Sequence, residues 1–497
     1  MRHLLLTLFI ILNVSVWGAN PMSIYNVFNV RDYGAKGDGI HVDSKAINDA
    51  IIAANQAGGG IVYVPSGSYI CGSIHLMDNI HLYLSIGCKL IASDNSNLYD
   101  PEESKPQSPY QDRGHTYFEN SLIWGRNLKN VVISGCGLID GAGLVTFSDR
   151  PGSYGKANKA ICIVESHNVQ IKDITIVRGG HFAILLTGCN KVTLDNLIID
   201  TNRDGIDIDC CTNTIVSNCK VNSPYDDAIC PKSSFALGRK IVTENLSIIN
   251  CQVSAFKEGT LLDGTMQPHP VTWWTSRSGR IKFGTESNGG FRNCVVSNCT
   301  FHSCKGLALE QVDGGVLENI TITNLAMYNI DDYPIYVQLG ERLRDPNKKS
   351  HSVGKNIKIS NVVAYVADSL SGIHISGTKK FMLEDVYLSN INVTYKGGAT
   401  MTDAKFPEIG ESYPEIGAFG KLVPSYGVFA RHINGFYLDN VHVKLENRDM
   451  RPAVYIYNAN NVEIDKFKAD ITEGIQVAKF ENVNNLKIYH TPVLNNF

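Results

Sequence analysis

The chain has 497 residues, of which 19% are charged, and its formal net charge is -3. It shows no basic excess and no long run of like charges, so we expect no nucleic-acid partner held by its phosphates. This length would ordinarily indicate about two or three domains, but a repeat architecture escapes that rule because each repeat packs only on its neighbours.

The chain begins with a pattern typical of a secretory signal peptide. Arg2 and His3 form a short basic start, an apolar run follows over residues 4–16, and Gly18 and Ala19 offer small residues for cleavage. The run is shorter than the about 20 apolar residues of a membrane-spanning helix. We expect residues 1–19 to be a signal peptide and the remainder to be secreted or periplasmic, with no membrane partner. A membrane anchor is the alternative.

A helical pattern occurs once, near the start. Between Asp43 and Ala57, small and apolar residues recur at helical intervals, and three glycines at 58–60 end the pattern. This spacing predicts an amphipathic helix. The segment that follows, Ile61–Pro65, is rich in β-branched residues and predicts a strand.

Short segments rich in Val and Ile recur through the rest of the chain, and many begin with Asn. The copies that start at Asn168, Lys191 and Asn213 are 23 and 22 residues apart. Apolar and polar residues alternate within each copy, as in Val169 and Ile171, which predicts strands. Asn at the corners favours bends, because it tolerates left-handed backbone and can form ladders with the Asn above it.

A period of about 22 residues with few helical stretches predicts an all-β fold, a single-stranded right-handed parallel β-helix. Residues 20–497 would form one domain, and the helix near the start would cap its open end, as terminal repeats require.

The 13 cysteines also follow the repeat. Cys219, Cys251, Cys294 and Cys299 each follow an Asn. A residue in phase with a repeat is expected to stack inside it, where a free Cys behaves as a small hydrophobe. We therefore favour buried thiols over a disulfide framework, which remains the alternative.

Acidic residues cluster on two consecutive repeats. Asp204 opens the segment Asp-Gly-Ile-Asp-Ile-Asp, and the pair Asp226-Asp227 begins 22 residues later. An offset of one coil predicts that Asp226 stacks on Asp204, with Asp227 beside it. Like charges at this distance raise at least one pKa, which leaves a protonated acid beside charged partners. Glycoside hydrolysis needs this arrangement. Acids that only shape the corners, or a calcium site, are the alternatives.

With these residues in view, the sequence resembles glycoside hydrolase family 28, the polygalacturonase and rhamnogalacturonan hydrolase family. The resemblance extends from the opening segment Phe28–Gly39 to the last coils. It is carried by Asn202-Arg203-Asp204-Gly205-Ile206-Asp207 and by Asp226-Asp227 with the following Lys232.

The resemblance implies a pectin-lyase-like solenoid and a secreted glycosidase that cleaves galacturonic-acid linkages in pectin, without a cofactor or metal and as a monomer. It implies that Asp227 is the general acid and that Asp204 and Asp226 hold the attacking water. Inversion at the anomeric carbon would place acid and base carboxyls about 6.5–9.5 Å apart.

Two motifs of that family are altered in this chain. No His occurs in Ser278-Gly279-Arg280, where the family has Gly-His-Gly, and the family's Arg-Ile-Lys is Ala308-Leu309-Glu310. In polygalacturonases, the Arg and Lys of this second motif bind the carboxylate of a galacturonate. In this chain, either Arg280, Lys282 or Lys232 binds that carboxylate instead, or the neighbouring sugar is neutral, as rhamnose is in rhamnogalacturonan I. The predicted substrate-binding residues are Asn202, Lys232, Arg280, Lys282, Glu310 and His181.

An insertion at about 255–278, which contains Trp273 and Trp274, predicts a loop beside the substrate cleft. A loop that blocks one end of the cleft would favour exo-action. Two alternatives to hydrolysis remain open. One is a calcium-dependent pectate lyase on the same fold, and the other is a non-catalytic carbohydrate-binding β-helix.

Overall fold

The computed structural model describes residues 26–103, 113–146, 156–270, 277–344, 350–400, 407–414 and 422–494. The predicted signal peptide, and Trp273 and Trp274, lie outside these ranges. Within them, no helix has both the length and the hydropathy needed to cross a membrane.

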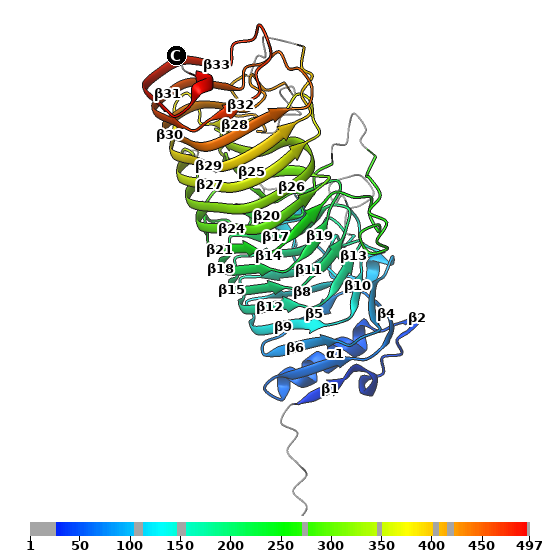
Figure 1. Cartoon of the computed structure of the whole chain (residues 1–497). Coiled ribbons are helices and arrows are strands. Elements are labelled where there is room, and N and C mark those ends of the chain that lie inside the picture. The colour runs from blue at the N-terminus through cyan, green and yellow to red at the C-terminus, as the bar shows by residue number, and fades with distance from the viewer. Residues whose placement is uncertain are drawn as a thin grey trace, which may run out of the picture.

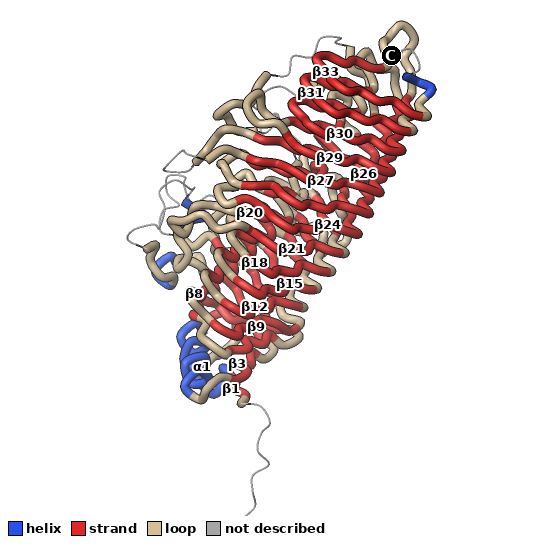
Figure 2. The backbone as a smooth tube through the Cα atoms, turned by 90° about the vertical axis from the view of Figure 1, so that its left-hand side faces the viewer, coloured by secondary structure: helices blue, strands red, loops and turns tan. Residues whose placement is uncertain are grey.

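The described strands stack as rungs of one long parallel solenoid (Figure 1). Every strand pairing with a defined register is parallel, so the architecture is an all-β parallel β-helix. The long loops project from one side of the stack (Figure 2).

The acidic motif lies in a sheet of six described strands. In the order in which they stack, these strands are β5 (Ile74–His75), β8 (Ile123–Arg126), β11 (Lys159–Val164), β14 (Phe182–Thr187), β17 (Asp204–Asp209) and β20 (Ile229–Lys232). A bridge from Ile229 to Ile281 continues the same stack into later strands. We call this sheet and its continuation the site face.

The other described strands join in a sheet that wraps the remaining faces and, in its later strands, also supplies the continuation of the site face. They are β1 (Val27–Asn29), β2 (Asp38–Val42), β3 (Gly60–Val64), β4 (Gly67–Cys71), β6 (Ile80–Leu84), β7 (Cys88–Ala92), β9 (Lys129–Gly135), β10 (Leu138–Asp140), β12 (His167–Lys172), β13 (Thr175–Val177), β15 (Asn190–Asp195), β16 (Ile198–Asp200), β18 (Thr212–Ser217), β19 (Lys220–Asn222), β21 (Thr243–Ile249), β22 (Gln252–Ser254), β23 (Lys282–Phe283), β24 (Gly290–His302), β25 (Lys305–Gln311), β26 (Val316–Leu339), β27 (Val353–Val366), β28 (Ile373–Ser376), β29 (Leu383–Tyr395), β30 (Val428–Leu445), β31 (Val454–Asp465), β32 (Lys468–Ala469) and β33 (Ala478–Tyr489).

Aliphatic side chains stack in columns inside the solenoid. On the site face, Ile184 pairs with Ile206 and Ile206 pairs with Ile229, and all three are fully buried. No single coil could bury these side chains, because a coil has no second layer of its own, so burial comes from stacking. The core is therefore a continuous apolar rod along the axis.

Asparagine ladders mark the corners, as the sequence predicts. Asn168, Asn213 and Asn319 have left-handed φ values of 59°, 54° and 56°. Asn319 donates to Asn293 at 3.0 Å, and Asn356 donates to Asn319 at 2.8 Å. Asn suits these positions because it tolerates a positive φ and carries both a donor and an acceptor.

The cysteines are all free, which confirms the prediction of thiols. Twelve are buried and Cys136 is exposed. The Sγ of Cys219 donates to the carbonyl of Ser217 at 3.1 Å, two residues back along its own corner. The thiol of Cys219 thus fills the inside of its corner, and none of the thiols is cross-linked.

Four short helices accompany the longer helix α1 (Ser44–Gln56) among the described residues. They are α2 (Arg113–Thr116) and the 3₁₀ helices η1 (Val30–Tyr33), η2 (Ser96–Leu98) and η4 (Pro492–Leu494). Helix α1 lies at the N-terminal end of the stack (Figure 1), and it buries Ile47 and Ile51 against the first strands.

The asparagine corners predict a measurable loss of stability on substitution. We expect Asn319→Ala to lower the free energy of unfolding by about 2 kcal/mol, because it loses the ladder bonds and places alanine in a left-handed conformation. Asn319→Gly keeps the conformation and loses only the ladder, so its loss should be about half as large. Urea unfolding followed by circular dichroism measures both. Equal losses would show that the backbone conformation contributes nothing.

Candidate active site

The acidic motif lies on two neighbouring rungs of the site face. Strand β17 begins at Asp204, and strand β20 follows Asp226 and Asp227. The two strands pair with an offset of 23 residues, as in Ile206 with Ile229, and the N–H of Gly205 donates to the carbonyl of Asp227 at 3.0 Å. Asp227 is therefore the residue that follows Asp204 in the stack, and the prediction that Asp226 would stack there is wrong.

The reason is the length of one connection. Strands β16 and β19, just before this corner, pair with an offset of 22 residues, as in Ile198 with Lys220. The connection that leads to β20 is one residue longer than the one that leads to β17. A one-residue shift moves the alternation of side chains to the other face of the strand.

The three aspartates nevertheless meet as the sequence predicts. One carboxylate oxygen from each of Asp204, Asp226 and Asp227 lies within 4.8 Å of the others. Asp204 and Asp227 are 3% and 2% exposed, whereas the side chain of Asp226 is 27% exposed. We call these residues the acid cluster. Two of its members are buried, and Asp226 is the one nearest to solvent.

Asp227 is held by three polar side chains from β23 and the residues before it. The Nε of Arg280 donates to its Oδ1 at 2.9 Å, and the Oγ of Ser278 donates to the same oxygen at 3.1 Å. The Nζ of Lys282 lies 3.2 Å from its Oδ2. Cations at these distances stabilise an ionised carboxylate.

Glu310, on β25, lies on the other side of the same two cations. It is fully buried, 3.9 Å from Arg280 and 4.0 Å from Lys282. The Nζ of Lys282 also lies 3.3 Å from the hydroxyl of Tyr413. Two cations and two carboxylates thus form a buried network whose formal charges cancel.

Asp204 lies in a more acidic setting. On the preceding rung, the Nε2 of His181 lies 4.0 Å from the Oδ2 of Asp204. Burial, and then the charges of Asp207 and Asp226, raise the pKa of Asp204 well above its ordinary value. Its Oδ1 has no hydrogen-bond partner in the described chain. Asp204 therefore keeps a proton at a pH where an exposed aspartate would be ionised.

Asp207 lies behind the cluster on the same strand. It is fully buried, and burial raises its pKa although Lys232 and His115 oppose the shift. Its Oδ2 is 3.5 Å from the Nζ of Lys232 and 3.3 Å from the Nε2 of His115. Lys232 also lies 3.4 Å from Glu286. Lys232 is thus part of a second buried network.

The exposed side of the cluster is lined by Asn202 and Arg203. The Nη2 of Arg203 donates to Oδ2 of Asp226. In the predicted insertion, burial raises the pKa of Glu258, and the side chain of Asn202 acts in the opposite direction. The described parts of that insertion, residues 255–270 and 277–278, form a loop without a helix or strand, in agreement with the sequence.

The structure brings the predicted site residues together in two groups. Arg280, Lys282, Glu310 and His181 surround the acid cluster, and Asn202 is at its rim. Lys232 contacts Asp207 instead. His115 could not be found from the sequence, because it comes from α2, 92 residues before Asp207, and no local pattern marks it. Asp207, by contrast, could have been predicted from the sequence, because it is the last residue of the motif at 202–207 that carries the family resemblance.

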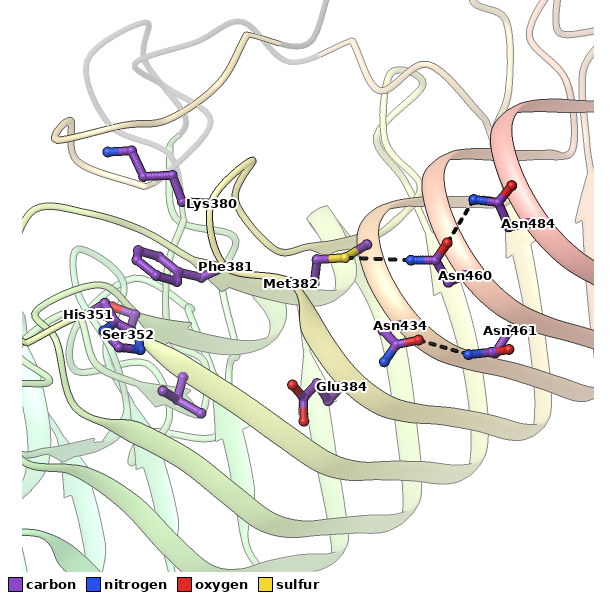
Figure 3. Close-up of a pocket in the computed structure, with 11 residues that line it drawn as sticks. His351, Ser352, Lys380, Phe381, Met382, Glu384, Asn434, Asn460, Asn461 and Asn484 are labelled. Atoms are coloured by element: carbon purple, nitrogen blue, oxygen red, sulfur yellow. Dashed lines mark hydrogen bonds between the residues drawn. The ribbon is translucent and has the colours of Figure 1, made fainter.

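Elsewhere on the described surface, a hollow of about 610 Å³ is lined by eleven residues, among them four asparagines, Lys380 and Phe381. Figure 3 shows its asparagines facing one another, with Asn461 donating to Asn434 at 2.9 Å. These amides continue the corner ladders, and none of the three aspartates lines the hollow. The carboxylates, and not the volume, locate the candidate active site.

Comparison with known proteins connects this geometry to a family. A family model described as "Rhamnogalacturonase A/epimerase, pectate lyase-like" matches residues 27–229. A probable polygalacturonase of Vitis vinifera is 27% identical over 297 residues, which cover 55% of this chain and 60% of that protein. The exo-poly-alpha-D-galacturonosidase of Dickeya chrysanthemi is 30% identical over 34% of this chain and 28% of its own length.

A relative of another kind is the plasmin and fibronectin-binding protein A of Streptococcus pneumoniae, which is 34% identical over 34% of this chain and 23% of its own length. This chain thus spans less than two thirds of each of these three relatives. Among solved structures, the family 28 exopolygalacturonase of Yersinia enterocolitica has a TM-score of 0.58 and 17% identity, over 93% of this chain and 78% of its own. This likeness supports the fold.

The raised pKa of Asp204 predicts how stability depends on pH. Folded protein binds more protons than unfolded protein between the ordinary value of about 3.9 and the raised value, so stability falls as pH rises through that window. We expect Asp204→Asn to become increasingly more stable than the parent protein as the pH rises from 4 to 8.

Thermal unfolding at a series of pH values measures this difference. Asp439→Asn, at an acid whose side chain is 55% exposed, is the matched control and should show no such trend. A difference that stays constant with pH would contradict the raised pKa.

Proposed function

The chain is a relative of the family 28 polygalacturonases, and from this premise we propose that it is a glycoside hydrolase that acts on pectic polysaccharide. The observation that carries the proposal is the acid cluster, in which three carboxylates lie within 4.8 Å of one another beside two buried cations. Hydrolysis of a glycosidic bond needs one carboxyl that gives a proton and one that activates water.

We propose that Asp226 donates the proton to the leaving oxygen and receives it from Asp204, the member of the cluster that keeps a proton, because carboxylate oxygens of the two residues lie within 4.8 Å of each other. Asp226 is the exposed member of the cluster, and the leaving group is a sugar, which is too large to reach the two buried acids. Arg203, which now hydrogen-bonds Asp226, would give way to the substrate at this position.

Asp204 and Asp227 would then hold the attacking water. They stack on adjacent rungs, and both are almost completely buried, so a molecule as small as water fits between them and the sugar. The ion pairs of Asp227 with Arg280 and Lys282 favour its ionised form, which is the form a base needs. The resemblance alone had assigned the general acid to Asp227, and these ion pairs favour the base role.

We propose inversion at the anomeric carbon, and this part rests on the resemblance. The nearest oxygens of the cluster, within 4.8 Å, are closer than the about 6.5–9.5 Å usual between the carboxyls of inverting enzymes. Proton NMR of the first product formed distinguishes the two courses, because a retained anomer would overturn inversion.

The charges around the cluster favour a neutral sugar beside the cleaved bond. Arg280 and Lys282 are both engaged by Asp227 and Glu310, and Lys232 is engaged by Asp207 and Glu286. None of these cations offers an uncompensated charge to a galacturonate carboxylate. We therefore propose galacturonate linked to rhamnose, as in rhamnogalacturonan I, as the substrate, with exo-action favoured by the loop at 255–270.

A calcium-dependent lyase is the second candidate, because the oxygens of the acid cluster are spaced closely enough for a shared cation. The fit is poor, since Arg280 and Lys282 already neutralise Asp227 and would repel a divalent ion. A carbohydrate-binding protein without turnover is the third candidate. One partial relative is named for binding two proteins, plasmin and fibronectin, and not for an enzymatic activity.

We also propose that the protein is exported to an extracytoplasmic space, on the strength of its first 19 residues, and that it is a monomer, as the resemblance implies. The solenoid is inferred to be right-handed, because crossover connections between parallel strands nearly always are. Helix α1 is proposed to cap it, because its apolar face covers the first rung.

Substitutions in the acid cluster test the mechanism. We expect Asp204→Asn, Asp226→Asn and Asp227→Asn each to lower kcat by about 10²- to 10⁴-fold, because each removes a group that moves a proton or holds the water. Asp439→Asn is the surface control. Undiminished turnover in all three variants would show that the acids are structural.

A substrate with an activated leaving group separates the roles. An aryl galacturonide with a nitrophenol leaving group needs no proton, so Asp226→Asn should retain most of the parent activity on it. Asp227→Asn should not, because water activation is still required. The opposite pattern would return the acid role to Asp227.

A panel of pectic oligosaccharides, incubated with and without a chelator, tests the substrate. We expect faster release of products from rhamnogalacturonan than from homogalacturonan, no ultraviolet-absorbing unsaturated ends, and no effect of the chelator. Faster release from homogalacturonan would defeat the neutral-sugar argument. Unsaturated products that vanish with chelator would establish the lyase.

A further inference from the structure

The site face continues past the acid cluster toward the C-terminal end. In register along it, Ala308 pairs with Tyr336, Tyr336 with His374, His374 with Phe429, and Phe429 with Tyr455. The outward position that carries Asp207 on β17 thus carries aromatic rings on four consecutive later rungs.

These rings form a ladder. The ring centroids of Tyr336 and His374 are 4.8 Å apart and stacked, those of His374 and Phe429 are 5.6 Å apart, and those of Phe429 and Tyr455 are 5.5 Å apart. The first three rings are buried, and the hydroxyl of Tyr336 donates to the carbonyl of Pro414. Only Tyr455, at the end of the ladder, is partly exposed.

A hollow of about 300 Å³ opens where the ladder emerges. It is lined by Lys379, Glu408, Pro424, Phe429, Arg431, Tyr455 and Tyr457. We call it the Arg431 hollow. Phe429, Tyr455 and Tyr457 contribute aromatic rings from two adjacent rungs to its lining. The ring of Tyr455 packs against Phe429, with centroids 5.5 Å apart, and the Nζ of Lys479 lies 4.7 Å from its centroid, so Tyr457 is the ring offered to the apolar side of a sugar.

Arg431 is fixed in place at this hollow. Its side chain is only 4% exposed, its Nε donates to the Oγ of Ser376 at 2.8 Å, and its Nη2 donates to the carbonyl of Pro407 at 3.0 Å. Its Nη1 is 3.5 Å from Glu408. A guanidinium held by several partners is preorganised, so little entropy is lost when it meets an anion.

The charges that line the hollow leave it positive. Lys379 is exposed, Arg431 is buried, and Glu408 is the acid among the lining residues. Burial opposes the charge on Glu408, but His432 and Arg431 lower its pKa, so it is ionised at neutral pH. Two cations against one carboxylate favour an anionic ligand.

We propose that the Arg431 hollow binds a uronic-acid residue of an acidic polysaccharide. The sugar ring lies against Tyr457, and its carboxylate pairs with Lys379 and Arg431. Aromatic walls with two convergent cations match a uronate, which has an apolar ring face and one carboxylate.

This site is separate from the acid cluster. Phe429 lies six rungs beyond Asp207 along the site face, which corresponds to about 29 Å at about 4.8 Å per rung. Segment 407–414 lies over the face between them, with Tyr413 at Lys282 and Glu408 at Arg431. The hollow therefore holds a sugar other than the one at the cluster, and the proposal does not depend on hydrolysis.

Crystals of the full chain soaked with D-galacturonic acid locate the sugar, because this monosaccharide has no bond to hydrolyse. We expect density in the Arg431 hollow with the carboxylate toward Lys379. Galactose, which differs only in having a neutral hydroxymethyl group at that carbon, is the matched probe and should leave the hollow unoccupied. Absence of galacturonate from the hollow, or equal occupancy by galactose, would overturn the proposal.

Isothermal titration in solution measures the contribution of single residues. We expect Lys379→Met to weaken galacturonic-acid binding at this site about tenfold and Tyr457→Ala to weaken it by a similar factor. Lys358→Met, at an exposed lysine on β27, changes the net charge equally and should have no effect. Unchanged binding in both hollow variants, or an equal loss in Lys358→Met, would refute a specific uronate site.

Discussion

The in-register stacking of parallel strands is the constraint on which the rest of this protein depends. Each rung lies about 4.8 Å above the last, so side chains that are about 22 residues apart in sequence become neighbours. The same rule fills the core with columns such as Ile206 on Ile229, and it brings Asp227 beside Asp204. Loops leave and return between rungs without disturbing this register, so they can differ in length from coil to coil.

Stacking buried carboxylates on one another would destabilise the fold through charge repulsion, and nearby cationic side chains reduce this repulsion. Arg280 and Lys282 lie beside the carboxylate of Asp227, and Lys232 and His115 lie beside that of Asp207. Asp204 lacks a cation of comparable proximity, and so it is the member that retains its proton. Differences in these partners, and not in the acids themselves, separate their proposed roles.

The same face serves a different chemistry further along. Rungs near the acid cluster present carboxylates and cations, whereas later rungs present Tyr336, His374 and Phe429 under segment 407–414. A solenoid can vary its outward residues freely because only the inward columns carry the core. One long surface can therefore hold a proposed reaction centre and a proposed second sugar site.

The sequence by itself determined the solenoid, its asparagine corners, its free thiols and the meeting of three aspartates, because a repeat period predicts to within one residue which side chains become neighbours. Only the tertiary structure decided the register at Asp227, since one extra residue in a connection shifts a strand by one position. It also decided that His115 reaches Asp207 and that Glu310 offsets Arg280. Such contacts, made by loops and by cations from other rungs, depend on how the chain runs between the strands, and the repeat period carries no information about that.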